Sequence, residues 1–178
     1  MPVQIGANTH SFSDPTGLLS DCHRRIEMFL GSLQGVAKVI DSPLSTEARG
    51  ALENALHYFH EAAPKHTEDE EESLFPRLRQ IHNPEIESAL SALNALEDDH
   101  RRADALHAEV HALAVQCLER SHLPFHEAGR FRQAVDDLTS IYGGHIRIEE
   151  NVIFPAAKRA LSSAQKSSIA NEMASRRK

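Results

Sequence analysis

The amino-acid sequence predicts an all-α protein, folded as an antiparallel up-down-up-down four-helix bundle. Aromatic residues make up only 5% of the chain and tryptophan is absent, whereas Ala and Leu recur in long stretches, which favours helix over sheet. Proline, glycine and short polar residues divide the chain into four long segments, and helices joined by such short connections run antiparallel to their neighbours. With 178 residues, we expect a single domain over 1–178, with an N-terminal arm at 1–13, a bundle core at about 14–161 and a C-terminal tail at 162–178.

The first two helices are predicted from their caps and breaks. Asp14 can cap a helix whose first residue is Pro15 and whose pattern runs to about Ile40, before a proline-containing break. Ser45 can cap a second helix that continues to about Ile81.

The other two helices follow the same logic. Asn83 is the expected cap and Pro84 the first residue of a third segment that continues through about 85–119. A short polar break then leads into a fourth helix at about 125–161. The tail at 162–178 is expected to add a short helix or to fray.

Composition and charge exclude several classes of protein. A formal net charge of −7 argues against a nucleic-acid partner, although the last three residues, 176–178, are basic. No segment approaches the roughly 18 consecutive apolar residues of a membrane span, and no secretory signal is visible. Cys22 and Cys117 do not form a paired motif, so we expect two reduced, buried thiols and a cytoplasmic location.

An internal duplication carries the chemical information. The pattern D-x-H-R-R occurs at 21–25 and again at 98–102. The pattern H-x-x-x-E-E, followed by an aliphatic residue, Phe and Pro at fixed offsets, occurs at 66–76 and again at 145–155. The first histidine precedes the second by 43 residues in one half and by 45 in the other. Two similar helical hairpins can therefore pack about a pseudo-twofold axis and bring the repeated side chains to one level.

The repeated side chains predict a metal centre. On a helix, a residue four positions after a histidine lies on nearly the same face, so each second histidine of the repeat pairs with a glutamate. The predicted ligands are His23, His66, Glu70, His100, His145 and Glu149. Buried together, these groups would be costly without a cation, and four imidazoles with two bridging carboxylates suit two metal ions. We expect two iron ions with an oxo or hydroxo bridge, with manganese as the second choice.

The alternative is that these residues are incidental. Most helical histidines lie on the surface, this chain has 12 of them, and an acidic run such as 68–72 is usually solvated. The repetition of the whole pattern at matching intervals favours the metal site. The remaining histidines have no counterpart in the other half and are expected to be ordinary, with His60 the first exception to consider. They are His10, His57, His60, His82, His107, His111, His122 and His126.

Five further residues are candidates for supporting the site. Glu27 and Asp104 each follow a D-x-H-R-R histidine by four residues, and we favour a hydrogen bond to an imidazole N–H over direct ligation. Phe75 and Phe154 can cover the metals, although a role in the bundle core is commoner for Phe. Tyr58 can reach an open metal position or lie in the core, and we favour the core.

Two local features complete the expectations. Glu71 and Glu150 are rotated by about 100° from the predicted ligands, so they should face solvent or a neighbouring helix. Pro64 and Gly143–Gly144 precede the second histidine of each half, so each helix is expected to bend there and aim its imidazole.

On His23, His100 and the motifs at 66–76 and 145–155, the chain resembles the hemerythrin-like, or HHE cation-binding, family. The resemblance implies an antiparallel four-helix bundle with a carboxylate-bridged non-haem di-iron centre that binds oxygen or responds to oxygen, nitric oxide, peroxide or iron. Asp104 occupies the position at which the invertebrate oxygen carriers have a second histidine. Reversible oxygen carriage therefore does not transfer directly.

Three functions remain open from the sequence. The first is a di-iron protein that binds or senses O2, peroxide, nitric oxide or iron, as a monomer or homodimer. The second is a di-iron enzyme with peroxidase-like, catalase-like or nitric oxide reducing activity. The third is a metal-free helical interaction bundle.

Overall fold

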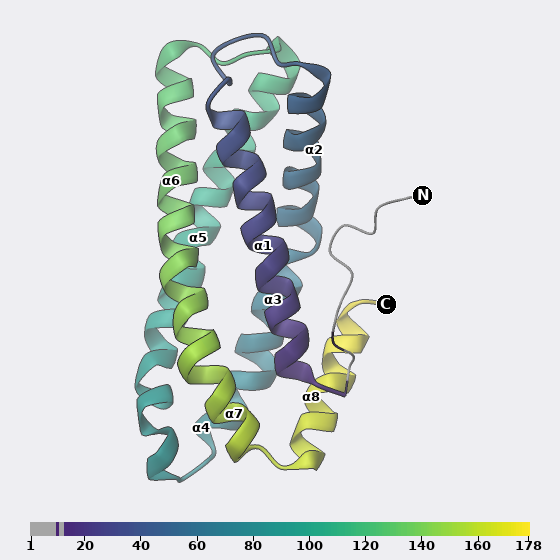
Figure 1. Cartoon of the computed structure of the whole chain (residues 1–178), viewed down its shortest axis with the longest axis vertical. Coiled ribbons are helices and arrows are strands. Elements are labelled where there is room, and N and C mark those ends of the chain that lie inside the picture. The colour runs from purple at the N-terminus through teal and green to yellow at the C-terminus, as the bar shows by residue number, and fades with distance from the viewer. Residues whose placement is uncertain (1–9, 11–12) are drawn as a thin grey trace. The chain divides into compact units, whose positions relative to one another are not determined.

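The computed structural model describes residue 10 and residues 13–178, and all regular structure within this part of the chain is helical (Figure 1). The predicted all-α class is therefore confirmed. The chain divides into two compact units. The first unit comprises Met1–Arg25, Ala63–Glu97 and His145–Lys178, and the second comprises Ile26–Ala62 and Asp98–Gly144.

The predicted caps fix the starts of the first two long helices. Helix α1 spans Pro15–Ala37, and the Asp14 carboxylate accepts a hydrogen bond of 3.0 Å from the backbone N–H of Gly17. Helix α2 spans Thr46–Glu61, and the Ser45 hydroxyl accepts from the N–H of Ala48. Side-chain acceptors at these positions satisfy backbone donors that have no partner within the helix.

Helix α1 ends three residues earlier than predicted, because tight turns replace the last helical turn. The N–H of Val39 donates to the carbonyl of Val36, and that of Ser42 donates to the carbonyl of Val39.

Helices α5 and α6 follow the third and fourth predicted segments. A short 3-10 helix, η2, at Pro84–Ile86 leads into α5 at Glu87–Arg120, and Asn83 caps it by accepting from the N–H of Glu85. Helix α6 spans Phe125–Ile148. Between them Ser121 has a positive φ of 69°, a left-handed conformation that stops α5.

Within the second unit, the two inter-helix connections lie at the same end. The N–H of Leu44 donates to the carbonyl of Ser121 at 2.9 Å, and the N–H of Leu123 donates to the carbonyl of Ile40 at 2.7 Å. The connection between α1 and α2 is thus bonded directly to the connection between α5 and α6. In this unit α1 and α5 run toward that end, and α2 and α6 run away from it.

The first unit contains the more irregular helices. Helix α3 at Ala63–Glu68 continues into a π-helical turn, η1, at Asp69–Leu74 and then α4 at Phe75–Arg79. Helix α6 continues in the same way into a second π-helical turn, η3, at Glu149–Ile153 and then α7 at Phe154–Ala160. The tail forms α8 at Ser163–Arg176, begun by a capping box between Ser162 and Gln165.

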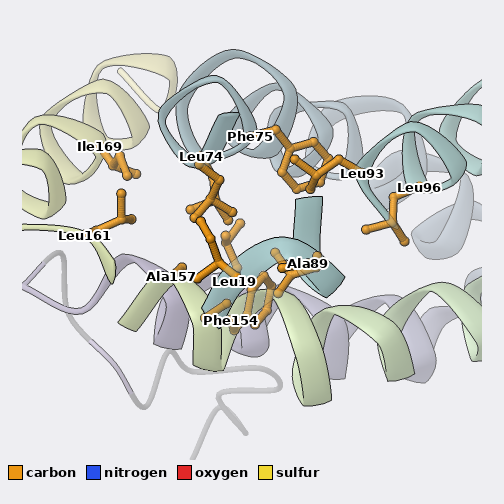
Figure 2. Packing of buried hydrophobic residues seen from close by; sticks show 14 of the residues in the cluster. Leu19, Leu74, Phe75, Ala89, Leu93, Leu96, Phe154, Ala157, Leu161 and Ile169 are labelled. Atoms are coloured by element: carbon orange, nitrogen blue, oxygen red, sulfur yellow. The ribbon is translucent and has the colours of Figure 1, made fainter. Parts of the chain in front are cut away.

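An apolar cluster joins these elements of the first unit (Figure 2). Leu19 of α1, Phe75 of α4, Leu93 of α5 and Phe154 of α7 are each at most 2% exposed. Met173 brings α8 into the same cluster. The tail helix is therefore part of the core of this unit and does not fray.

No helix in the described part of the chain is long and apolar enough to cross a bilayer. Both cysteines, Cys22 and Cys117, are buried thiols, as the sequence predicted.

Candidate metal centre

Five of the six predicted ligands lie in the first unit, on five different elements. His23 is on α1, His66 on α3, Glu70 in η1, His145 on α6 and Glu149 in η3. All five are at most 4% exposed, and the two glutamates are completely buried. The sixth, His100, is also buried but belongs to α5 of the second unit, so its assignment as a ligand rests on the sequence repeat.

The imidazole and carboxylate groups of the first unit converge on a small volume. Glu149 Oε2 lies 3.0 Å from His23 Nε2 and 3.2 Å from His145 Nε2. Glu70 Oε1 lies 3.2 Å from His66 Nε2. One potential ligand atom from each of His23, His66, Glu70 and Glu149 lies within 4.8 Å of all the others, and the same holds for Glu70, His145 and Glu149. These distances allow several donors to share one or two cations.

The polar atoms in this volume fit a cation better than they fit each other. Glu149 Oε2 and His23 Nε2 are only 3.0 Å apart, but their orientation does not allow a hydrogen bond. Among the described residues, these two atoms and Glu149 Oε1 have no hydrogen-bond partner. Leaving such buried atoms unsatisfied costs roughly 1–3 kcal/mol each, more when charged. A metal ion removes this cost, and mixed imidazole and carboxylate donors are suited to iron, manganese or zinc.

Burial also makes the two carboxylates of the site unequal. Burial and the charge of Glu149 raise the pKa of Glu70 well above its usual value. Burial alone would likewise raise the pKa of Glu149, but contacts with His145 and His23 outweigh it and lower that pKa. Two buried carboxylates this close repel one another unless positive charge lies between them. The electrostatics therefore match a site that holds a cation.

The carboxylate of Glu150 orients one ligand histidine. His23 Nδ1–H donates to Glu150 Oε1 at 2.7 Å, and the Ser20 hydroxyl donates to Glu150 Oε2 at 2.9 Å. Burial would lower the pKa of His23, but the carboxylates of Glu149 and Glu150 raise it to about 10. The sequence predicted only that Glu150 faces solvent or a neighbouring helix. It faces α1 and fixes Nδ1 of His23 as a donor, which leaves Nε2 directed at the site.

The other candidate supporting residues are placed as follows. The ring of Phe154 is stacked on His23, with centroids 5.3 Å apart and planes 9° apart, so Phe154 serves both the core and the site. Phe75 is a fully buried member of the apolar cluster. Glu27 and Asp104 are exposed residues of the second unit, and Nδ1 of His23 already donates to Glu150 of the first unit.

Tyr58 is a buried residue of the second unit. Its ring is stacked on Phe29, with centroids 4.4 Å apart, and it also meets Phe59 edge to face. This aromatic packing fits the predicted core role.

Both ligand glutamates are carried by π-helical turns, which the sequence analysis missed. The N–H of Phe75 bonds to the carbonyl of Glu70, and the N–H of Phe154 bonds to the carbonyl of Glu149, five residues back in each case. A proline follows each Phe and has no N–H for a normal helical bond, which disturbs the preceding turn in the same way in both halves. Such turns are frequent at functional sites.

The segments before the two ligand histidines, where bends were predicted, differ between the two halves. Pro64 lies in the second position of α3, just after α2 ends at Glu61, so the helix is interrupted there. Gly143 and Gly144 lie within a continuous α6, so no interruption of the helix accompanies the bend predicted there. Two consecutive glycines lower helix propensity, but bonds to the turns on either side keep them helical.

Most of the remaining histidines belong to the second unit. His107 Nε2 is 3.0 Å from the hydroxyl of Tyr142, and His60 Nδ1 is 2.9 Å from the carboxylate of Glu61. His10 contacts Asp21, the first residue of the D-x-H-R-R motif, at 3.2 Å. None of these contacts places a further imidazole among the five converging ligands.

Comparison with known proteins agrees with the geometry. The sequence profile of the family described as "Hemerythrin HHE cation binding domain" matches residues 14–157, which is most of the chain. The chain is also 28% identical over 173 residues to an uncharacterised protein of Haemophilus influenzae, covering 94% of this chain and 92% of the relative.

Proposed function

Because the chain belongs to the hemerythrin HHE cation-binding domain family, we propose that it is a non-haem di-iron protein that binds or senses O2, a related small oxidant such as peroxide or nitric oxide, or iron itself. The observation that carries this proposal is the buried set of three imidazoles and two carboxylates, in which Glu149 and His23 face each other without a hydrogen bond. A purely structural cluster would be expected to satisfy those atoms internally.

In this proposal the ligands are the six residues predicted from the repeat. Glu70, Glu149, His23, His66 and His145 would hold the two irons, with His100 added on the strength of the repeat. Manganese is the alternative metal. Iron pairs would supply redox chemistry and a position for a small exogenous ligand.

The protein's own residues would orient and protect that centre. Glu150 would hold the His23 ring through Nδ1, and the Phe154 ring would limit its rotation and exclude water from one side. Small ligands are the expected partners, since the net charge of −7 disfavours nucleic acid. The two buried thiols support a reducing, cytoplasmic setting.

We further infer the up-down-up-down order of the long helices, with the two halves of the repeat related by a pseudo-twofold axis. The hydrogen bonds between the two connections of the second unit support this order, because they bring the ends of α1 and α5 together. The matching π-helical turns support the twofold relation.

The decisive experiment is metal analysis of protein purified without added metal, together with its absorption spectrum in air and after reduction. We expect about two irons per chain and near-ultraviolet absorption that bleaches on reduction. Protein that contains no metal and takes up none from ferrous iron would refute the proposal. Binding of oxygen, nitric oxide or peroxide to the loaded protein would then identify the ligand.

A further inference from the structure

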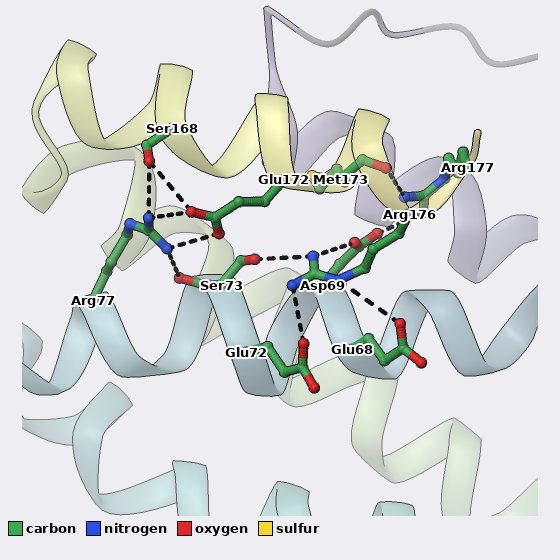
Figure 3. A network of polar contacts seen from close by, with 10 residues as sticks. All are labelled: Glu68, Asp69, Glu72, Ser73, Arg77, Ser168, Glu172, Met173, Arg176 and Arg177. Atoms are coloured by element: carbon green, nitrogen blue, oxygen red, sulfur yellow. Dashed lines mark hydrogen bonds and ion pairs between the residues drawn. The ribbon is translucent and has the colours of Figure 1, made fainter.

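The proposed ligand Glu70 has another buried carboxylate directly beside it in the sequence, that of Asp69. Asp69 precedes Glu70 in η1 and is 0% exposed. Two guanidinium groups of the tail helix compensate its charge: Arg176 Nη1 donates to Oδ1 at 2.9 Å, and Arg177 Nη2 donates to Oδ2 at 2.5 Å (Figure 3). Both carboxylate oxygens are therefore held from the end of α8, by its last residue and by the residue that caps it, more than 100 residues away in sequence.

The tail helix also holds the rest of the π-helical turn. Arg176 donates from Nη1 to the Ser73 hydroxyl at 2.9 Å and from Nη2 to the Glu72 carboxylate at 3.3 Å. Arg77, just beyond the turn, bonds to the Ser73 carbonyl and to Glu172 of α8, the latter at 2.6 Å (Figure 3). These bonds engage η1 at both of its ends.

The other half of the duplication lacks this arrangement. The residues of the repeat that correspond to Asp69, Ser73 and Arg77 are Ile148, Val152 and Ala156, all apolar. Those three residues belong to the apolar cluster or pack against it. The two halves therefore share their ligands but differ at three of the positions that contact α8 or its residues. The family match also ends at residue 157, before α8 begins.

We propose that Arg176 and Arg177 are positioning residues that lock η1 so that Glu70 stays directed at the metal centre, making α8 a clamp on one half of the site. The effect on the metal centre rests on the proposed metal-binding function. The clamp itself consists only of contacts within the first unit. A π-helical turn is rare and occurs mostly as a single turn inside an α-helix, so we expect this one to need support from outside the helix. Arg176 bridges Asp69 and Ser73, Arg177 holds the other oxygen of Asp69, and these charge-assisted bonds provide such support.

The first test uses metal-free protein and hydrogen exchange. In the variant Arg176→Gln/Arg177→Gln, amides of Asp69–Leu74 should lose protection, whereas those of Glu149–Ile153 should keep it. The matched control is Arg130→Gln/Arg132→Gln, which removes two guanidiniums from the second unit and should change neither turn. Unchanged protection of Asp69–Leu74, or an equal loss in both turns, would overturn the clamp, since the second result reports general destabilisation.

The second test measures iron release from the loaded protein to a strong chelator. Loss of the clamp should speed release by about 10–100-fold, because removing groups that orient ligands typically weakens metal affinity by about that factor. Asp69→Asn should act in the same direction, because it removes the charge that the two arginines hold. If η1 loses protection while iron release stays as fast as in the wild type, the positioning role is refuted. If the wild type itself never binds iron, the proposed function fails, whereas the exchange experiment still decides the clamp.

Discussion

Replacement of Glu149 by Gln separates metal binding from folding. Glu149 is completely buried and stands within 3.2 Å of both His23 Nε2 and His145 Nε2. Gln has nearly the same size but no charge, so it cannot neutralise a cation or bridge two of them. We therefore expect metal binding to fail in Glu149→Gln while the fold persists.

The size of the effect follows from linkage. A metal present at about 1,000 times its dissociation constant adds about 4 kcal/mol to the free energy of unfolding. For a chain of this length, each 1 kcal/mol raises the melting temperature by about 2–4 °C. Iron should therefore raise the melting temperature of the wild type by about 8–16 °C and that of Glu149→Gln by almost nothing.

Without metal the two proteins should melt at similar temperatures. The substitution removes the attraction of Glu149 to His23 and His145, but it also removes the repulsion that raises the pKa of Glu70. Calorimetry with and without ferrous iron, paired with elemental analysis, measures both effects. Glu53→Gln, at an exposed glutamate 3.7 Å from Arg49, is the control for a lost surface charge. A full iron complement and an undiminished thermal shift in Glu149→Gln would refute the ligand assignment.

Three further outcomes are expected. Glu150→Gln should weaken iron affinity by about 10-fold or more in a chelator competition, because His23 loses its charged acceptor, and equal affinity would contradict this role. Met173→Ala should lower the free energy of unfolding by about 2–5 kcal/mol in urea titrations, whereas Asn171→Ala on the exposed face of α8 should change it little. Burial lowers the pKa of His107 to about 4, so the unfolded chain binds the proton more readily between pH 6.5 and 4. Stability should fall across that window as pH decreases, by up to about 3 kcal/mol from this group, and His107→Leu should show a shallower loss in the same titrations.

The starts of the helices could be predicted from the sequence because they depend on residues only a few positions apart. Asp14, Ser45 and Asn83 all cap the helices they were expected to cap, since a cap depends only on a side chain and an N–H two or three residues away. The predicted ligands of the repeat are likewise buried. Each His–Glu pair was recognisable in the sequence because residues four apart lie on the same face of a helix.

The features that escaped prediction depend on contacts between distant segments. The bond from His23 to Glu150 joins residues 127 apart, and the bonds from Arg176 and Arg177 to Asp69 span 107 and 108 residues. Nothing within the acidic run distinguishes Asp69 from the exposed Glu68 and Glu72 until α8 is placed beside it. The π-helical turns were not predicted from the sequence, because 3.6 residues per turn describes only an ordinary α-helix.

The spacing of buried residues around the widened turns links the metal site to the core. His66, Glu70, Leu74 and Leu78 are all buried, and so are their counterparts His145, Glu149, Ile153 and Ala157.

A period of four would drift by about 40° per step around an ordinary α-helix, so its fourth member would point about 120° away from its first. The extra residue in the π-helical turn compensates for this rotation, so the predicted ligands and the core residues stay on the same face of the helix. Deleting a single residue from either turn would restore the ordinary phase and rotate everything beyond it by about 100°. The predicted metal ligands and the residues of the apolar cluster could then not both face the interior. Loss of one residue would therefore disrupt either the metal site or the packing of the core.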